Sequence, residues 1–220
     1  MKRVWYLMAV LAALIVGARP AAAEKALCLV CSVKEGASHE EEVKAWRTYE
    51  GTRYGFCSEK CASEFDADAA AYVPPVLPRP APELSVADLA GKPVTWKSLE
   101  GRVVLVDFWA TWCGPCRKSM PELQALHEKY SARGFTVLGV SIDEGNAAAK
   151  VKKFVAARKI RYPIAVDSEK TPTWERYRVK AVPAAFLVDQ KGQVVAQWTG
   201  TSVDAADLEA RLGALLKPTD

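Results

Sequence analysis

The six cysteines are the residues of this chain whose type and spacing could do chemistry, and they occur in three close pairs. The pairs are Cys28/Cys31, Cys57/Cys61 and Cys113/Cys116. A disulfide that closes so short a loop removes little entropy from the unfolded chain, so these pairs would be poor structural staples. Such spacing suits thiol–disulfide exchange or metal chelation better.

The third pair lies in the segment VDFWATWCGPC, residues 106–116, where we predict a buried strand, a short turn and then a helix. The start of a helix carries unsatisfied N–H groups and about half a positive charge, and both stabilise a thiolate. We therefore expect the pKa of Cys113 to fall from about 8.5 into the range of roughly 3.5–7.5. Cys113 would attack a disulfide, and the less exposed Cys116, one turn further on, would resolve the mixed disulfide.

The spacing of this pair is not specific by itself. C-x-x-C also serves as half of a zinc site or as a structural pair. The strand–turn–helix context favours redox chemistry instead. Pro115 fits that context, because proline suits the first helical turn, where its missing N–H costs nothing.

Asp107 and Pro183 are further candidates for the same site. Asp107 interrupts a buried apolar run six positions before Cys113. Burial is expected to raise the pKa of this carboxyl, which would let it take up the proton of Cys116; the alternative is a strand-end carboxylate facing water. Pro183 precedes the apolar run 184–188, and a proline entering a strand cannot extend the ladder normally.

The four remaining cysteines could share one metal ion. A hairpin with strands at 45–49 and 53–56 is predicted between the two pairs. Ser58 is a candidate cap for a helix that places Cys57 and Cys61 one turn apart. Two thiolates from a knuckle and two from a helix start can close a tetrahedron around zinc. The alternatives are two disulfides in an oxidising compartment and electron exchange with Cys113.

The elements that must position the redox pair alternate between strand and helix patterns. Apolar runs predict strands over 103–108, 135–142 and 164–166, and a hairpin over 184–188 and 194–198. Helical spacing is predicted over 114–132, 147–158 and 204–216. This order predicts an α/β domain whose mixed sheet has a parallel centre, an antiparallel edge and helices on both faces.

The N-terminal residues have the pattern of a targeting segment. Lys2 and Arg3 precede an apolar run over 4–16, and the small residues 21–23 suit cleavage. We predict a signal peptide over residues 1–23, because the run is short for a membrane span; an uncleaved N-terminal anchor is the alternative. Export would place the protein in the periplasm or cell envelope, an oxidising compartment.

Five prolines within residues 73–82 mark the strongest internal boundary. We expect these prolines to exclude helix and sheet ladders and to form a stiff, extended linker. The linker divides a small α+β module, residues 24–72, from a larger domain, residues 83–220. The net charge of +4 would fall to about +1 on loss of the signal peptide. A nearly neutral protein gives no indication of nucleic-acid binding.

The segments FWATWCGPC and AVPAAFLVDQKGQVV resemble the corresponding motifs of thioredoxin-like proteins of the TlpA/ResA class. The resemblance covers residues 83–220, including a hairpin added before the central strand. It implies a thioredoxin-like fold, Cys113 and Cys116 as the redox pair, and Pro183 as a cis proline facing Cys113. Asp107 matches the buried acid of thioredoxin, and Ser119 stands where the exported class commonly has Glu.

CLVC, residues 28–31, and the segment YEGTRYGFCSEKCASEFDADAAAYV resemble the YHS/TRASH-type cysteine modules, which are linked to heavy-metal binding or sensing. The resemblance covers residues 26–73. It implies four metal ligands, namely Cys28, Cys31, Cys57 and Cys61. Soft thiolates favour zinc and copper. We assign no chemistry to His39, in an acidic run, or to His127, in the helix after the redox pair.

These residues and resemblances together predict an exported thiol–disulfide oxidoreductase that reduces disulfides of client proteins. The resemblance implies a membrane thiol–disulfide electron donor as partner, and apocytochrome c or the copper-site cysteines of an oxidase as clients. The redox reaction needs no cofactor, whereas the small module is expected to hold zinc or copper. The alternative is a metal-binding or metal-delivery protein whose redox domain keeps its thiols reduced.

Overall fold

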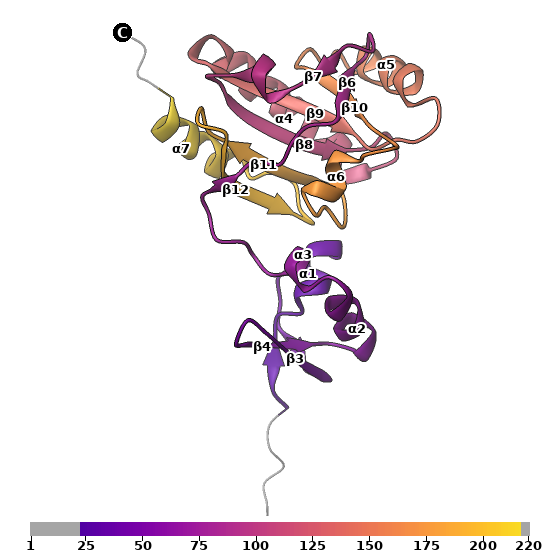
Figure 1. Ribbon diagram of the computed structural model, residues 1–220, viewed down its shortest axis with the longest axis vertical. Helices are drawn as coiled ribbons and strands as arrows, with labels where there is room; N and C mark the ends of the chain where they lie inside the picture. Colours follow the sequence, from indigo (N-terminus) through magenta and orange to yellow (C-terminus); the bar gives the residue numbers. More distant parts are fainter. Residues whose placement is uncertain (1–22, 217–220) are drawn as a thin grey trace, which may run out of the picture.

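The computed structural model describes residues 23–216, which form two modules joined by a short segment (Figure 1). The predicted signal peptide lies outside the described residues apart from its last residue, Ala23. Within the described range, no helix is both long and apolar enough to cross a membrane.

The small module packs short helices against a hairpin. Its elements are β1 (Lys25–Ala26), α1 (Leu29–Glu35), β2 (Glu41–Glu42), β3 (Ala45–Tyr49), β4 (Thr52–Phe56), α2 (Glu59–Ala67) and α3 (Ala69–Tyr72). The predicted hairpin is confirmed, since β3 and β4 pair antiparallel over their whole length. The predicted cap is confirmed as well: the Cys61 amide donates a hydrogen bond to Ser58 Oγ at 3.2 Å.

Phe65 is the centre of the core of the small module. Its ring centroid lies 4.9–6.4 Å from those of four other aromatic rings, which belong to Tyr49, Tyr54, Phe56 and Tyr72. The buried cluster around Phe65 contains seven residues. So small a core contributes only modest stability, and modules of this size commonly need a further constraint such as a disulfide or a metal.

The larger domain is built on an eight-stranded sheet. Its strands are β5 (Arg79–Pro80), β6 (Val86–Asp88), β7 (Pro93–Val94), β8 (Val103–Trp109), β9 (Phe135–Ser141), β10 (Ile164–Asp167), β11 (Ala184–Val188) and β12 (Gln193–Thr199). Their order is β5-β12-β11-β8-β9-β10-β6-β7. The strands β8, β9 and β10 run parallel, and the other neighbours pair antiparallel, which confirms the predicted mixed sheet.

The helices cover the two faces of this sheet unequally. The helices are α4 (Gly114–Tyr130), α5 (Ala147–Ala157), α6 (Thr173–Arg176) and α7 (Ala205–Leu215), with 3-10 turns η1 (Trp96–Leu99) and η2 (Ser131–Arg133). The three long helices, α4, α5 and α7, all pack on one face, in a core that includes Leu105 and Trp109. On the other face, the core around Val106 and Phe108 is covered by loops, η1 and the short α6. Helices on both faces were predicted, but those of the second face are single turns.

The linker between the modules differs from its prediction at its C-terminal end. Arg79 and Pro80 form β5, which pairs with Val194 and Gln193 of β12. The expectation that prolines exclude a sheet ladder here is therefore wrong. A proline is tolerated on an edge strand because the N–H it lacks would face away from the sheet. This pairing ties the linker to the larger domain (Figure 1).

The two modules touch near the end of the sheet that carries β12. Lys180 forms an ion pair with Asp68 at 2.8 Å. Gly200, just after β12, has a φ of +72° and lies against the end of α1, so that a Cβ there would collide with the carbonyl oxygens of Ser32 and Val33. Only glycine fits such a close approach of two backbones at positive φ.

Candidate active site

Cys113 is the N-cap residue of α4, immediately after the turn that follows β8. It forms a disulfide with Cys116, and the two Cα atoms are 5.4 Å apart. The Cys116 amide donates a hydrogen bond to Cys113 Sγ at 3.2 Å. An N–H group of the first helical turn therefore points at this sulfur, as expected at a helix start, and it would stabilise the anion of Cys113 in the reduced protein.

Trp112, next to Cys113 in the chain, is an exposed aromatic residue. Its side chain is 64% exposed, whereas Cys113 and Cys116 are 4% and 2% exposed. A large exposed aromatic beside a nearly buried sulfur is suited to holding an apolar segment of a client protein against that sulfur.

Pro183 lies at the same end of the sheet as the redox pair. The Val182–Pro183 peptide bond is cis, as the resemblance implied. The next residue, Ala184, pairs with Phe108 of β8, so Pro183 is placed beside the end of the strand that leads to Cys113. The register of β8 and β11 therefore brings together two motifs about 70 positions apart in the sequence.

Asp107 is buried in the strand, as predicted. It is 4% exposed. Its side chain lies on the same face of β8 as those of Leu105 and Trp109, which belong to the core that contains α4 and Cys116. Burial raises the pKa of this carboxyl from its ordinary value of 3.8 to about 7. A carboxyl that titrates near neutrality can both accept and return a proton under physiological conditions.

Two aromatic side chains near Asp107, those of Tyr162 and Trp109, carry buried polar atoms. The hydroxyl of Tyr162 and Nε1 of Trp109 are buried and form no hydrogen bond within residues 23–216. Gly139 pairs with Asp107 in the neighbouring strand, and a Cβ at Gly139 would be in tight contact with the side chains of both Tyr162 and Trp109. The missing side chain at Gly139 lets these rings close over the strand and exclude water from Asp107.

Asp143 is a positioning residue for the turn before Cys113, and we did not predict it from the sequence. Its side chain is inaccessible and accepts hydrogen bonds from Thr111, from the amide at 2.8 Å and from Oγ1 at 2.6 Å. Ser141 Oγ donates to the same carboxylate at 2.9 Å, and Lys150 pairs with it at 2.5 Å. Because Thr111 lies in the turn between β8 and Cys113, Asp143 fixes the geometry of that turn.

The charge of Asp143 is stabilised despite its burial. Burial raises the pKa of this carboxyl, but the hydrogen bonds from Lys150, Thr111 and Ser141 outweigh it, and the net pKa lies below the ordinary value. The sequence carries a signal for this residue, since an Asp at the end of a buried apolar strand needs a partner. Its partner Thr111 is 32 positions away, and only the parallel register of β8 and β9 identifies it.

The four cysteines of the small module converge, as predicted, on one point. Their sulfur atoms all lie within 4.8 Å of one another. Cys31 Sγ is 3.5 Å from that of Cys57 and 3.8 Å from that of Cys61, and Cys57 and Cys61 are 3.7 Å apart. A disulfide requires about 2.05 Å, so these four thiols are not paired by disulfides.

The thiols of this cluster differ in their acidity. Burial raises the pKa of Cys28, but the backbone N–H groups of Cys31 and Cys57 stabilise its anion and bring the net pKa below the ordinary value. Burial raises the pKa of Cys57 to about 11 and, together with the neighbouring thiols, raises that of Cys31. Without a cation, Cys28 is therefore a stronger acid than Cys31 or Cys57.

Three other polar residues singled out in the sequence have local partners. His127 Nδ1 accepts a hydrogen bond from the Val137 amide at 3.3 Å, which agrees with a packing role. His39 is exposed, 3.6 Å from Glu41. Ser119 Oγ donates to the Cys116 carbonyl at 3.0 Å, so it is satisfied within its own helix.

Two family models match the chain. The AhpC/TSA family model covers residues 77–197, and the YHS domain model covers residues 41–76. Two of the four clustered cysteines, Cys57 and Cys61, lie inside the YHS match, whereas Cys28 and Cys31 precede it.

Curated relatives and solved structures agree with the AhpC/TSA match. The chain is 38% identical over 120 residues to a thiol-disulfide oxidoreductase ResA of Bacillus cereus, covering 54% of this chain and 68% of that protein. It is 29% identical over 125 residues to ResA of Bacillus subtilis, and the match covers 57% of this chain and 68% of that protein.

Among solved structures, a candidate thiol:disulfide interchange protein DsbE from Chlorobium tepidum superposes with a TM-score of 0.57 at 35% identity, covering 63% of this chain and 96% of that one. The thioredoxin domain of a thiol-disulfide oxidoreductase from Bacteroides vulgatus superposes with a TM-score of 0.58 at 27% identity. The match covers 66% of this chain and 100% of that one. These matches extend over the larger domain, where the pair Cys113/Cys116 is located.

Proposed function

This chain belongs to the AhpC/TSA family and is a thiol–disulfide oxidoreductase of thioredoxin-like fold, and we propose that it reduces disulfides of client proteins in the cell envelope. The observation that carries the proposal is the Cys113–Cys116 disulfide at the start of α4. The predicted signal peptide, residues 1–23, is the reason for the periplasm or cell envelope as the location.

The geometry of the pair supports the following reaction. The thiolate of Cys113 attacks one sulfur of the client disulfide, which forms a mixed disulfide and releases the second client sulfur as a thiolate. Cys116 then gives up its proton to Asp107 and attacks Cys113 Sγ. This second step breaks the mixed disulfide, releases the reduced client and leaves the Cys113–Cys116 disulfide. Two electrons pass from the pair to the client.

The positions of the neighbouring residues support the roles that we propose for them. Pro183 lies just before β11, beside the end of β8, where the backbone of a bound client segment would dock next to Cys113. Trp112 supplies an exposed apolar surface for the same segment. The oxidised pair must be reduced again for the next cycle, and we propose a membrane thiol–disulfide electron donor as the source of these electrons.

The clients we propose are envelope proteins with paired cysteines that must be reduced before a cofactor is attached: apocytochrome c, or the copper-site cysteines of an oxidase. Both present two close thiols that oxidise readily in an oxidising compartment. The four-cysteine module beside the redox domain favours the metal-linked client.

Trapping tests the client assignment. In the Cys116→Ser variant the mixed disulfide on Cys113 cannot be resolved, so the client is expected to remain attached and to be identified by mass spectrometry. The double variant Cys113→Ser/Cys116→Ser is the control and should trap nothing. Capture of envelope proteins that contain no close cysteine pair, or capture through another cysteine of this chain, would contradict the proposal.

We also propose that the small module holds one zinc ion through Cys28, Cys31, Cys57 and Cys61. A tetrahedral zinc with Zn–S distances of about 2.3 Å places its sulfur ligands roughly 3.8 Å apart. The three sulfur–sulfur distances given above, 3.5–3.8 Å, fit this value. Four thiolates so close together would repel one another, and a bound cation removes that repulsion. Copper(I), which thiolates also favour, is the alternative occupant.

Metal analysis tests this site. The purified protein is expected to contain about one zinc per chain, because four thiolates form a closed structural site. The variant Cys57→Ser/Cys61→Ser should lose the metal, whereas the matched variant Cys113→Ser/Cys116→Ser should retain it. A metal-free protein with two disulfides among residues 24–72 would refute the site, and copper in place of zinc would refute the choice of metal.

A further inference from the structure

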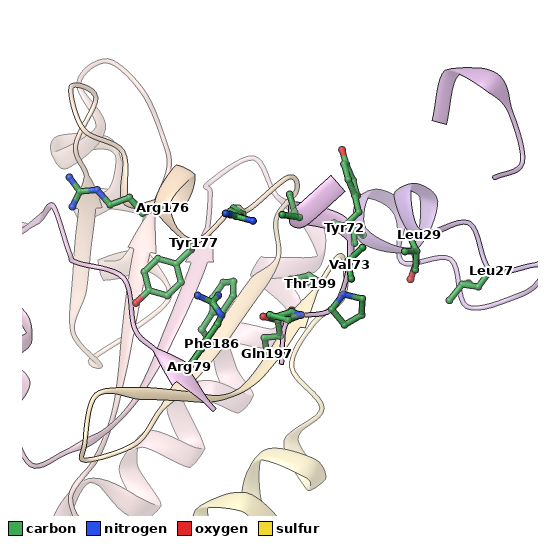
Figure 2. Close-up of a pocket in the computed structure, with 17 residues that line it drawn as sticks. Leu27, Leu29, Tyr72, Val73, Arg79, Arg176, Tyr177, Phe186, Gln197 and Thr199 are labelled. Carbon is green, nitrogen blue, oxygen red and sulfur yellow. The ribbon is translucent and has the colours of Figure 1, made fainter. Parts of the chain in front are cut away.

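A cavity of about 460 Å³ lies between the two modules (Figure 2). The larger domain contributes Arg79, Tyr177, Phe186, Gln197 and Thr199, and the small module contributes Leu27, Leu29, Tyr72 and Val73, as Figure 2 shows. The cavity is on the face of the sheet that long helices leave open. Its volume is within the range typical of small-molecule sites.

The charge of the cavity wall is entirely positive. Three arginines line it, namely Arg79, Arg176 and Arg178, and none of its lining residues is an Asp or Glu. Arg176 donates to the Glu83 carbonyl at 3.4 Å, and in Figure 2 its guanidinium extends away from the apolar residues. The two arginines that remain for a ligand are Arg79 and Arg178.

Arg79 is held in β5 with part of its guanidinium buried. Its Nε is buried and has no hydrogen-bond partner within residues 23–216. Burial lowers the pKa of Arg79, and Arg178 lowers it further by charge repulsion. Neither arginine lies within ion-pair distance of a carboxylate in the described part of the chain.

Arg178 follows α6 in a left-handed conformation, with a φ of +55°. Glycine usually takes this position at the end of a helix, because a Cβ destabilises the conformation by about 1 kcal/mol. The chain therefore has an exposed arginine at the mouth of the cavity where the backbone alone would favour glycine.

Two neighbouring cations, neither of which is in an ion pair within the described residues, form a site for an anion. A partly buried guanidinium without a partner is costly, and an anion that pairs with it removes the cost. The planar guanidinium matches a carboxylate, which it can bind through two parallel hydrogen bonds. The other wall is apolar and includes Leu29, Val73, Pro74 and Pro75, so the ligand must also carry an apolar body.

We propose that this cavity binds a small organic carboxylate, whose charged group pairs with Arg79 and Arg178 and whose apolar body lies against the small module. The ligand would touch both modules at once. Binding would therefore hold the small module on the larger domain, a role distinct from thiol–disulfide exchange at Cys113.

Calorimetric titration with octanoate tests the proposal on the purified, oxidised protein. Octanoate combines the carboxylate with an apolar chain, 1-octanol has the chain without the charge, and inorganic phosphate has charge without the chain. We expect octanoate to bind and the other two to bind at least about tenfold more weakly, since both halves of the site are needed.

Three variants locate the site. Arg79→Gln and Arg178→Gln are each expected to weaken octanoate binding about tenfold or more, the effect of losing a charge-assisted hydrogen bond. Ala70→Trp fills the cavity from α3 and should abolish binding while insulin disulfide reduction persists. Arg161→Gln is the matched control, because Arg161 is exposed, lies near Glu128 and is outside the cavity.

The proposal is overturned if octanoate does not bind at millimolar concentration, or if 1-octanol or phosphate binds as tightly as octanoate. It is also overturned if the arginine variants and Ala70→Trp bind octanoate like the parent protein. If Arg79→Gln does not fold, octanoate binding by Arg178→Gln tests the proposal alone. The side chain of Arg178 is exposed, so its replacement leaves the core intact.

Discussion

Replacing Cys113 by serine is expected to abolish disulfide reduction, with a loss of more than about a thousandfold in the rate of insulin reduction by dithiothreitol. The thiolate is the attacking species in exchange, and a serine hydroxyl stays protonated at any pH the protein tolerates. The serine variant can still fold, because Cys113 caps α4 through its Sγ and serine is itself a good cap.

The pH dependence of alkylation tests independently whether Cys113 is an activated thiolate. Cys113 Sγ accepts the Cys116 amide at the start of α4, and this interaction is stronger for the anion than for the thiol. In the reduced protein, iodoacetamide should therefore modify Cys113 with a midpoint below about 8.5, the ordinary thiol value. Cys57→Ser is the control and should leave the midpoint unchanged.

A serine variant that keeps more than a tenth of the parent rate would show that another thiol attacks the client. An alkylation midpoint of Cys113 at or above the ordinary value would show that the helix does not activate it. Either result would remove the reductase mechanism based on this pair.

The Asp107→Asn variant is expected to be more stable than the parent protein at pH 8 and to work more slowly. Burial raises the pKa of Asp107 to about 7 in the folded protein, whereas in the unfolded chain it is near 3.8. The difference of about three pKa units corresponds to a destabilisation on the order of 4 kcal/mol when the carboxyl is ionised.

The sign of this effect depends on which state binds the proton. Between about pH 4 and pH 7 the folded protein keeps the Asp107 proton while the unfolded chain has lost it. Stability therefore falls as the pH rises through this window, and the contribution becomes constant above about pH 7. Asparagine does not titrate, so the stability of Asp107→Asn relative to the parent protein should increase between about pH 4 and pH 7.

Denaturant unfolding of parent and variant from pH 4 to pH 8 measures this difference. Both proteins are kept oxidised, so that Cys113 and Cys116 do not titrate, and the difference between them isolates Asp107. Glu122→Gln, an exposed acid of α4, is the matched control and should show no such dependence. A parent and an Asp107→Asn variant with parallel stability curves would contradict the raised pKa.

The loss of activity in Asp107→Asn has its own readout. If Asp107 takes the proton of Cys116, removal of the carboxylate should slow release of the mixed disulfide by roughly a hundredfold, the scale of general base catalysis. The first attack by Cys113 should change much less, and stopped-flow kinetics separate the two steps. Equal slowing of both steps would indicate a structural effect instead.

The amino-acid sequence by itself determined the strand and the helix that hold the redox pair, and the chemistry of that pair. The apolar residues 103–106 and Phe108 predicted a buried strand, and the residues after it, with Pro115, begin a helix. These are local rules, in which side-chain period and helix-start preferences act over a few neighbouring residues. The hairpin over 45–56 and the cap at Ser58 followed from the same kind of signal.

Other features were decided only by the tertiary structure. The contact of Asp143 with Thr111 depends on the pairing of β8 with β9, and the unpartnered Arg79 depends on a proline-rich segment that joins the sheet edge. The cavity between the modules needs both of them in place. In each case the partners are far apart in the chain, and their meeting is set by strand register and packing. No local pattern around either partner encodes that register, so the sequence could suggest a buried acid or an unusual linker but not what each would touch.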